Sequence, residues 1–114
     1  MNYFYVGNGV HGKMGISSYV FQQLVDTTVS EELNGEEKDA LTAKGGLRKA
    51  KNRIEIDSKG SKLRVYVEIY GYKLSDFKKA CERLQQAVYE AVYQTTEVAP
   101  TVDVTLLGVL DRND

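Results

Sequence analysis

The sequence is poor in cysteine, histidine and proline, with one residue of each among 114. A single cysteine, Cys81, excludes an internal disulfide, so nothing in the chain requires an oxidising compartment. His11 has no second histidine and no cysteine at the spacings typical of a zinc site. No Ser, His and Asp set and no carboxylate pair stands in a recognisable context. We therefore expect no catalytic residue, no metal and no cofactor.

Long apolar runs and an excess of one charge are also missing. No run approaches the roughly 20 residues of a membrane-spanning helix, and the N-terminus lacks the pattern of a signal peptide. Lys and Arg number 15 against 16 Asp and Glu, and a net charge of -1 gives the whole chain no general attraction to nucleic acid or anionic lipid. We expect a soluble cytoplasmic protein with one domain, residues 1–114.

The best-defined stretch is 62–92, which predicts a long strand, a tight corner and a long helix. Alternation places four aliphatic side chains of the strand on one face: Leu63, Val65, Val67 and Ile69. The helix carries an apolar stripe at three- and four-residue steps: Phe77, Ala80, Cys81, Leu84, Val88, Ala91 and Val92. Gly71 suits the corner, and we expect Ser75 to cap the helix. The stripe needs a sheet to cover, so strand and helix should fold back on each other.

Residues 2–6 are apolar and aromatic enough for a short strand, or for an arm that docks on a neighbour. The glycines of 7–12 satisfy G-x-G-x-x-G and nearly satisfy the P-loop pattern, with Met14 where Ser or Thr is needed. A phosphate cradle must lead directly into a helix, whereas 13–16 predicts a short strand before a helix capped by Ser17 or Ser18. We interpret this segment as a glycine-rich turn, with His11 solvated.

The first helix should run to about Leu33 and stop at the Asn34-Gly35 pair, and 36–43 fits a short helical turn. Residues 34–52 form a flexible basic insert. Its second half overlaps a run, 44–53, that holds five cations and no acid: Lys44, Arg48, Lys49, Lys51 and Arg53. Such a run can hold the phosphates of RNA, DNA or lipid. We favour a solvated loop neutralised by the acids of 31–39, because the run contains none of the aromatics of a stacking platform.

The remaining segments complete the sheet. Residues 53–57 predict a strand, 57–61 a hairpin loop that joins it antiparallel to the long strand, and 101–110 a last strand after Pro100. The order strand, helix, strand, strand, helix, strand predicts an α+β fold, a small two-layer sandwich with two helices on one face of a mixed three- to four-stranded sheet. The core spans about 12–110, with 1–11 as an N-terminal arm and turn.

With these elements in place, the chain resembles the alkaline shock protein family of Gram-positive bacteria. The likeness lies in patterns of fold over about 12–110 rather than in chemistry. The segments that carry it are GKMGIS (12–17), IEI (54–56), LRVYVEIYG (63–71), the helix at 76–93 with VYEAV (88–92), and VDVTLLGV (102–109). Two features depart from the family. It usually has a proline before the second helix, where this chain has Ser75, and the basic insert is unusually long.

The resemblance implies a non-enzymatic cytoplasmic protein that self-associates as a homo-oligomer, gathers at the inner face of the membrane through a membrane-anchored partner, and supports cell-envelope homeostasis under stress. The family has no catalytic residues to transfer. The sequence itself offers Tyr66, Tyr70 and Tyr72 as candidate partner-binding residues, because they point away from the aliphatic face of the central strand. A second layer, such as 3–5, would cover them if it packed there.

Two other classes of function stay open. A nucleic-acid-binding module would use the basic run at 44–53, and 9–12 fits the G-x-x-G of one such domain. That loop should join two helices, however, whereas here it precedes the first. A small enzyme or nucleotide-responsive regulator would use the loop at 7–13. We favour the interaction protein over both.

Overall fold

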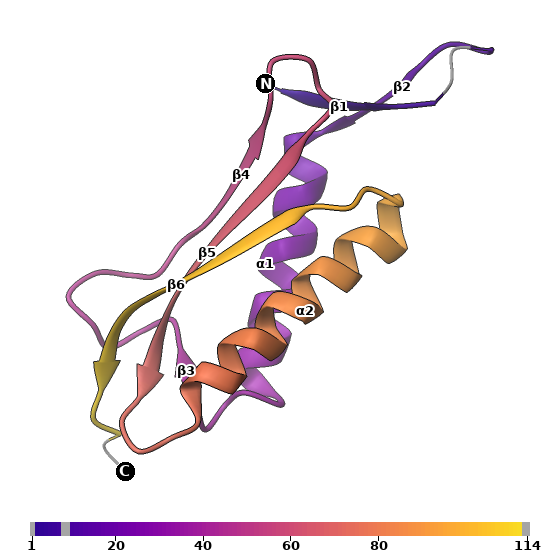
Figure 1. The fold of residues 1–114 in the computed structure, drawn as a ribbon. Coiled ribbons are helices and arrows are strands. Elements are labelled where there is room, and N and C mark those ends of the chain that lie inside the picture. Colours follow the sequence, from indigo (N-terminus) through magenta and orange to yellow (C-terminus); the bar gives the residue numbers. More distant parts are fainter. Residues whose placement is uncertain (1, 8–9, 113–114) are drawn as a thin grey trace.

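The computed structural model describes residues 2–7 and 10–112 and has the α+β fold that the sequence predicts (Figure 1). Two helices are present in this part of the chain, α1 (Ser18–Asn34) and α2 (Phe77–Thr96). One sheet contains β3 (Leu41–Thr42), β4 (Asn52–Ile56), β5 (Leu63–Tyr72) and β6 (Thr101–Leu110). A separate two-stranded sheet is formed by β1 (Tyr3–Val6) and β2 (Met14–Ser17).

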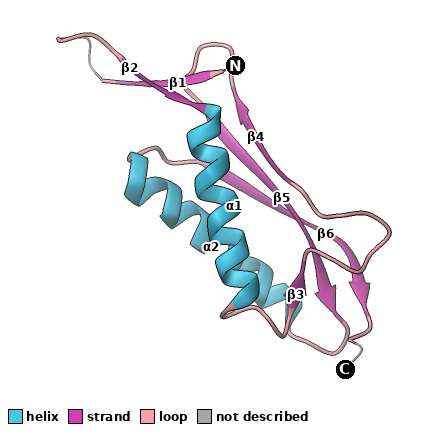
Figure 2. Cartoon of the chain, turned by 180° about the vertical axis from the view of Figure 1, so that it is seen from behind, coloured by secondary structure: helices cyan, strands magenta, loops and turns pink. Residues whose placement is uncertain are grey.

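Strand β5 is the centre of the larger sheet. β4 and β3 pair antiparallel with its first and last parts, and β6 pairs parallel with it over 64–72. Because β6 runs along one side of β5 throughout, β3 and β4 share the other side. The sheet is therefore mixed, as predicted. Both helices lie on the same face of it, and the segment between β3 and β4 projects beyond the opposite face (Figures 1 and 2).

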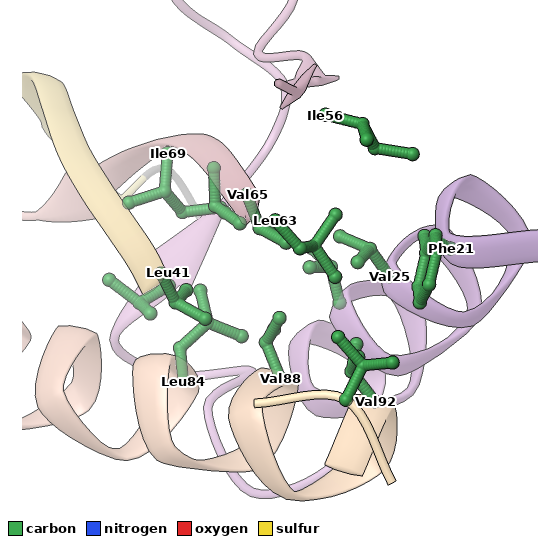
Figure 3. Packing of buried hydrophobic residues seen from close by; sticks show 14 of the residues in the cluster. Phe21, Val25, Leu41, Ile56, Leu63, Val65, Ile69, Leu84, Val88 and Val92 are labelled. Carbon is green, nitrogen blue, oxygen red and sulfur yellow. The ribbon is translucent and has the colours of Figure 1, made fainter. Parts of the chain in front are cut away.

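The core lies between the helices and the inward face of the sheet (Figure 3). Alternate residues of β5 are buried against both helices, as their spacing predicts, and α2 contributes one residue per turn: Ala80, Leu84, Val88 and Val92. From α1 come Phe21, Val25 and Val29. Each large aliphatic side chain buried here stabilises the fold by about 2 kcal/mol, so this stripe fixes which faces of the helices meet the sheet.

The β1–β2 hairpin projects from one end of the molecule (Figure 1) and is held there by the β4–β5 turn. The backbone N–H of Tyr5 donates to the carbonyl of Gly60 at 2.8 Å, and the ring of Phe4 meets Phe21 edge-on. Gly60 has φ +67°, and a Cβ there would lie 2.6 Å from the backbone oxygen of Tyr3. Of the predicted segment 2–6, residues 3–6 thus form a strand that packs on its own chain and does not cover the tyrosines of β5.

The corner before α2 differs from the prediction. Asp76, not Ser75, occupies the N-cap position, and its side chain makes no capping hydrogen bond. The hydroxyl of Ser75 instead donates to the carbonyl of Tyr72 at 2.6 Å, closing the turn after β5. Leu74 is fully exposed and adopts a positive φ of 68°. The hydroxyl of Ser75, which the sequence assigned to the helix cap, therefore closes the turn between β5 and α2 instead.

Residues 35–40 form turns after α1, and the chain then enters the short strand β3, which the sequence did not indicate. An ion pair with a buried carboxylate fixes this segment. The carboxylate of Glu37, 1% exposed, accepts two hydrogen bonds from the guanidinium of Arg83 on α2, at 2.9 and 2.8 Å. Two parallel bonds to a planar guanidinium set both distance and orientation. The connection from α1 to the sheet is thereby anchored on α2.

Candidate interaction surfaces

The outward face of the sheet carries paired polar side chains instead of a bare aromatic row. Tyr66 is half-buried, and the guanidinium of Arg53 lies 4.1 Å from the centre of its ring. Arg53 also forms a 3.1 Å ion pair with Glu55, whose other oxygen accepts from the Tyr66 hydroxyl at 3.4 Å. A cation over an aromatic face is favourable. Tyr66 is therefore partly exposed to solvent, next to the guanidinium of Arg53.

Tyr70 corrects the expectation of three exposed tyrosines, because it is only 4% exposed. Its side chain points to the outward face, yet the segment between β3 and β4 folds over it. Its hydroxyl donates to the carbonyl of Arg48 at 2.5 Å and accepts from the backbone N–H of the same residue at 3.3 Å. A Cβ on Gly46 would overlap the Tyr70 ring. Tyr70 therefore binds the loop between β3 and β4 of its own chain, and its ring is too buried to contact a partner.

Tyr72 lies at the end of β5 and is half-buried, with the guanidinium of Arg112 5.1 Å from its ring centre. Tyr66 and Tyr72 thus share one environment, a partly open ring beside an arginine. A partner-binding role for these two residues stays a prediction. Tyr and Arg are the side chains that interfaces favour, so the two positions keep the composition of a contact surface.

The basic run is a closed loop. The backbone N–H of Ala50 donates to the carbonyl of Ala43 at 3.2 Å, which joins the two ends of the loop. Arg48 forms a bidentate pair with Glu68 of β5, at 2.8 and 2.6 Å, and the backbone N–H of Lys51 donates to the same carboxylate at 3.1 Å. The hydrogen bonds from Arg48 are the main reason that the pKa of Glu68 is below its usual range, and the bond from Lys51 lowers it further.

The five cations of the run therefore divide into two groups. Arg48 and Arg53 are neutralised by carboxylates of the strands, whereas the other three form no ion pair in the described part of the chain: Lys44, Lys49 and Lys51. None of the acids of 31–39 forms an ion pair with this run in the described part of the chain, where Glu37 pairs with Arg83 and Asp39 with Arg112. The run contains no aromatic residue, but Tyr66 of β5 lies beside it, with the guanidinium of Arg53 over its ring.

The outer edge of β6 is an interaction surface that the sequence analysis missed. In the described residues β6 pairs with β5 only, so the other side of this ten-residue strand has no neighbouring strand. Leu106 and Val109 are 38% and 47% exposed at this edge. The side-chain amide of Gln85 donates to the Val102 carbonyl at 2.7 Å and covers the beginning of the edge. Ten residues without Lys, Arg or Pro were the available signal.

The remaining candidates lie elsewhere. The strand β2 separates the glycine-rich turn from α1, as predicted, so this turn does not run into a helix N-terminus; residues 8 and 9 lie outside the described part.

Cys81 is half-buried, and burial raises the pKa of its thiol. No group of three or more His, Cys, Asp or Glu side chains among residues 2–7 and 10–112 could hold a metal ion. Neither described helix is long and apolar enough to cross a membrane.

Comparison of the chain with protein-family models, with curated proteins and with solved structures gives no match.

Proposed function

We propose that the protein is a non-enzymatic interaction protein of the cell-envelope stress type, which self-associates and binds a membrane-anchored partner from the cytoplasmic side. The observation that carries this proposal is the open edge of β6, with two exposed aliphatic side chains. The resemblance of 12–110 to the alkaline shock protein family supports the stress-related role. It also supports the placement at the inner face of the membrane.

Self-association through β6 follows from the chemistry of a free strand edge. Such an edge presents unpaired N–H and C=O groups, and proteins that keep it free usually place lysine or proline there. β6 has neither, and its one charged residue is Asp103. Its apolar residues are concentrated in 106–110, so an antiparallel second copy centred near Leu107 sets apolar side chains against apolar ones. The preferred occupant of this edge is therefore a second copy of the chain.

The outward face is the surface we assign to the membrane-anchored partner. Neither helix of the described part of the chain covers it, and it offers Tyr66 and Tyr72, each beside an arginine. A tyrosine ring supplies apolar area at low entropic cost, and tyrosine beside arginine is a composition that interfaces favour. The two surfaces differ in place and chemistry, so both can be occupied in one assembly.

A crosslinked pull-down from the native host, run with and without nuclease, tests both contacts. We expect wild-type bait to recover further copies of itself and a membrane protein, and nuclease to remove neither. Leu106→Lys should lose the copies, and Tyr66→Ser combined with Tyr72→Ser should lose the membrane protein while keeping the copies. Recovery dominated by RNA or DNA, with protein lost after nuclease, would contradict the proposal and favour nucleic-acid binding through 44–53.

A further inference from the structure

A hollow of about 810 Å³ lies between the second half of α1 and the segment 38–52. Leu33 of α1, which is half-buried, supplies its apolar lining together with the small exposed parts of Val29 of α1 and Leu41 of β3. The hollow exists because the edge of the sheet is interrupted there. β3 and β4 both pair with β5, but the chain between them leaves the edge and crosses to the outward face. The size is within the range of small-molecule sites, about 300–1,000 Å³.

The charges around this hollow are almost all of one sign. Four lysines line it: Lys38, Lys44, Lys49 and Lys51. None of them forms an ion pair among the described residues, in contrast to Arg48 and Arg53. The only acid of the lining is Asp26, and its carboxylate already accepts from the amides of Gln22 and Asn52, each at 3.0 Å. The ammonium groups of Lys38, Lys44 and Lys49 are thus left to solvent or to a ligand, while that of Lys51 also interacts electrostatically with Glu68.

The wall that carries three of these lysines is fixed without a ligand. The loop is closed between Ala43 and Ala50, and the side chains of Tyr70 and Glu68 hold its middle and its end. The backbone N–H of Lys44 donates to the hydroxyl of Thr42 at 3.2 Å. A site whose wall is already ordered loses less entropy when it binds.

We propose that this hollow is a binding site for a small organic phosphate, whose phosphate group meets the lysines and whose apolar or planar body lies against Val29 and Leu33. Lysines bind phosphate as point charges, and several around one hollow suit a multiply charged group. The phosphate can belong to a free small molecule or to a lipid headgroup. The site does not depend on self-association, because it lies at the other edge of the sheet from β6.

Phenyl phosphate is the probe that separates the two halves of this site, with inorganic phosphate and phenol as comparators. Ligand-observed NMR measures affinity whatever the size of the protein assembly, and hydrogen exchange with mass spectrometry locates the ligand. We expect saturable binding of phenyl phosphate, weaker binding of each comparator, and slowed exchange in 38–52 and in the second half of α1.

Charge variants provide the matched control. Lys38→Gln, Lys49→Gln and Lys51→Gln together should weaken binding about tenfold, since each exposed charge contact contributes modestly. Lys59→Gln, Lys78→Gln and Lys79→Gln remove the same three charges from exposed positions outside the lining and should leave the affinity unchanged. Equal losses in the two triple variants, or no saturable binding, would overturn the proposal.

Vesicles of phosphatidylcholine containing phosphatidylglycerol distinguish the two sources of the phosphate. Co-sedimentation that the first triple variant loses and the second keeps identifies a lipid headgroup. Binding of phenyl phosphate without co-sedimentation identifies a free anion, and both results support the site. A random single-stranded RNA that binds more tightly than phenyl phosphate and depends equally on Arg48 and Arg53 would overturn it, in favour of a nucleic-acid surface.

Discussion

The hydroxyl group of Tyr70 is hydrogen-bonded to both backbone groups of Arg48, its carbonyl oxygen and its N–H, across 22 positions of the sequence. This pair of bonds positions the basic loop, and with it three of the four lysines of the hollow. Replacing Tyr70 by Phe removes both bonds and keeps the ring. We expect the free energy of unfolding to fall by about 1 kcal/mol, and amide exchange at 44–50 to quicken. Unchanged exchange there would show that the ion pair with Glu68 suffices to hold the loop.

The ion pair between Glu37 and Arg83 should respond unequally to the loss of each partner. Glu37 is 1% exposed, whereas the side chain of Arg83 is 55% exposed. Arg83→Met leaves a buried carboxylate without a partner, at a cost of about 2 kcal/mol for that carboxylate. Glu37→Met leaves a guanidinium that water can solvate, so it should cost less. Denaturant unfolding of both single variants and the double variant checks this order, and the reverse order would refute it.

Much of this fold could be predicted from the sequence, because its elements carry clear patterns. The last strand, 101–110, has the predicted bounds, since alternation and Pro100 define it. β3 could not be predicted, because it has two residues and depends on a tertiary hydrogen bond from the N–H of Tyr72 to the carbonyl of Ala40. The apolar stripe of α2 predicted that the helix covers a sheet. It did not predict that β6 would pair parallel with β5.

The candidate surfaces were harder to predict, for a physical reason. Alternation correctly directed Tyr70 to the outward face, but its burial depends on a loop that closes over it, and loop closure has no periodic signal. Composition likewise predicted a basic run, but not that strand carboxylates would take up Arg48 and Arg53 and leave the lysines unpaired.

Stability should decrease in acid through two carboxylates whose pKa values are lowered in the folded state. In Asp57 the main cause is hydrogen bonding from the backbone N–H of Lys62 and then of Ser61, and in Glu68 it is the bond from Arg48. A lowered pKa gives stability that is present above the ordinary pKa, about 4, and is lost as pH falls through the folded value. Melting temperatures should therefore drop below about pH 5.

The matching variants locate this acid sensitivity. Asp57→Asn and Glu68→Gln should each lower the melting temperature at pH 7 and flatten its decline in acid. Glu90→Gln, an exposed position on α2, serves as the comparison and should leave the profile unchanged. A wild-type melting temperature that stays constant from pH 7 to pH 3 would contradict the assignment.

Docking of the β1–β2 hairpin should depend on the absence of a side chain at Gly60. Gly60→Ala sets a Cβ 2.6 Å from the oxygen of Tyr3, so we expect about 1–3 kcal/mol of destabilisation and faster amide exchange at Tyr5. Gly12 is the matched control, because it also has a positive φ but has open space around it. If Gly12→Ala destabilises the protein as much as Gly60→Ala, backbone conformation rather than docking is responsible.

Copies of this chain should associate through the free edge of β6, and sedimentation velocity across a concentration series tests this association most directly. We expect wild-type protein to sediment faster as concentration rises, and Leu106→Lys to remain monomeric because a charged side chain is unfavourable in a paired apolar edge. Leu47→Lys, the same change at a fully exposed loop position, should associate like wild type, as should Tyr66→Ser. Association that survives Leu106→Lys, or a wild-type chain that stays monomeric at every concentration, would contradict the account.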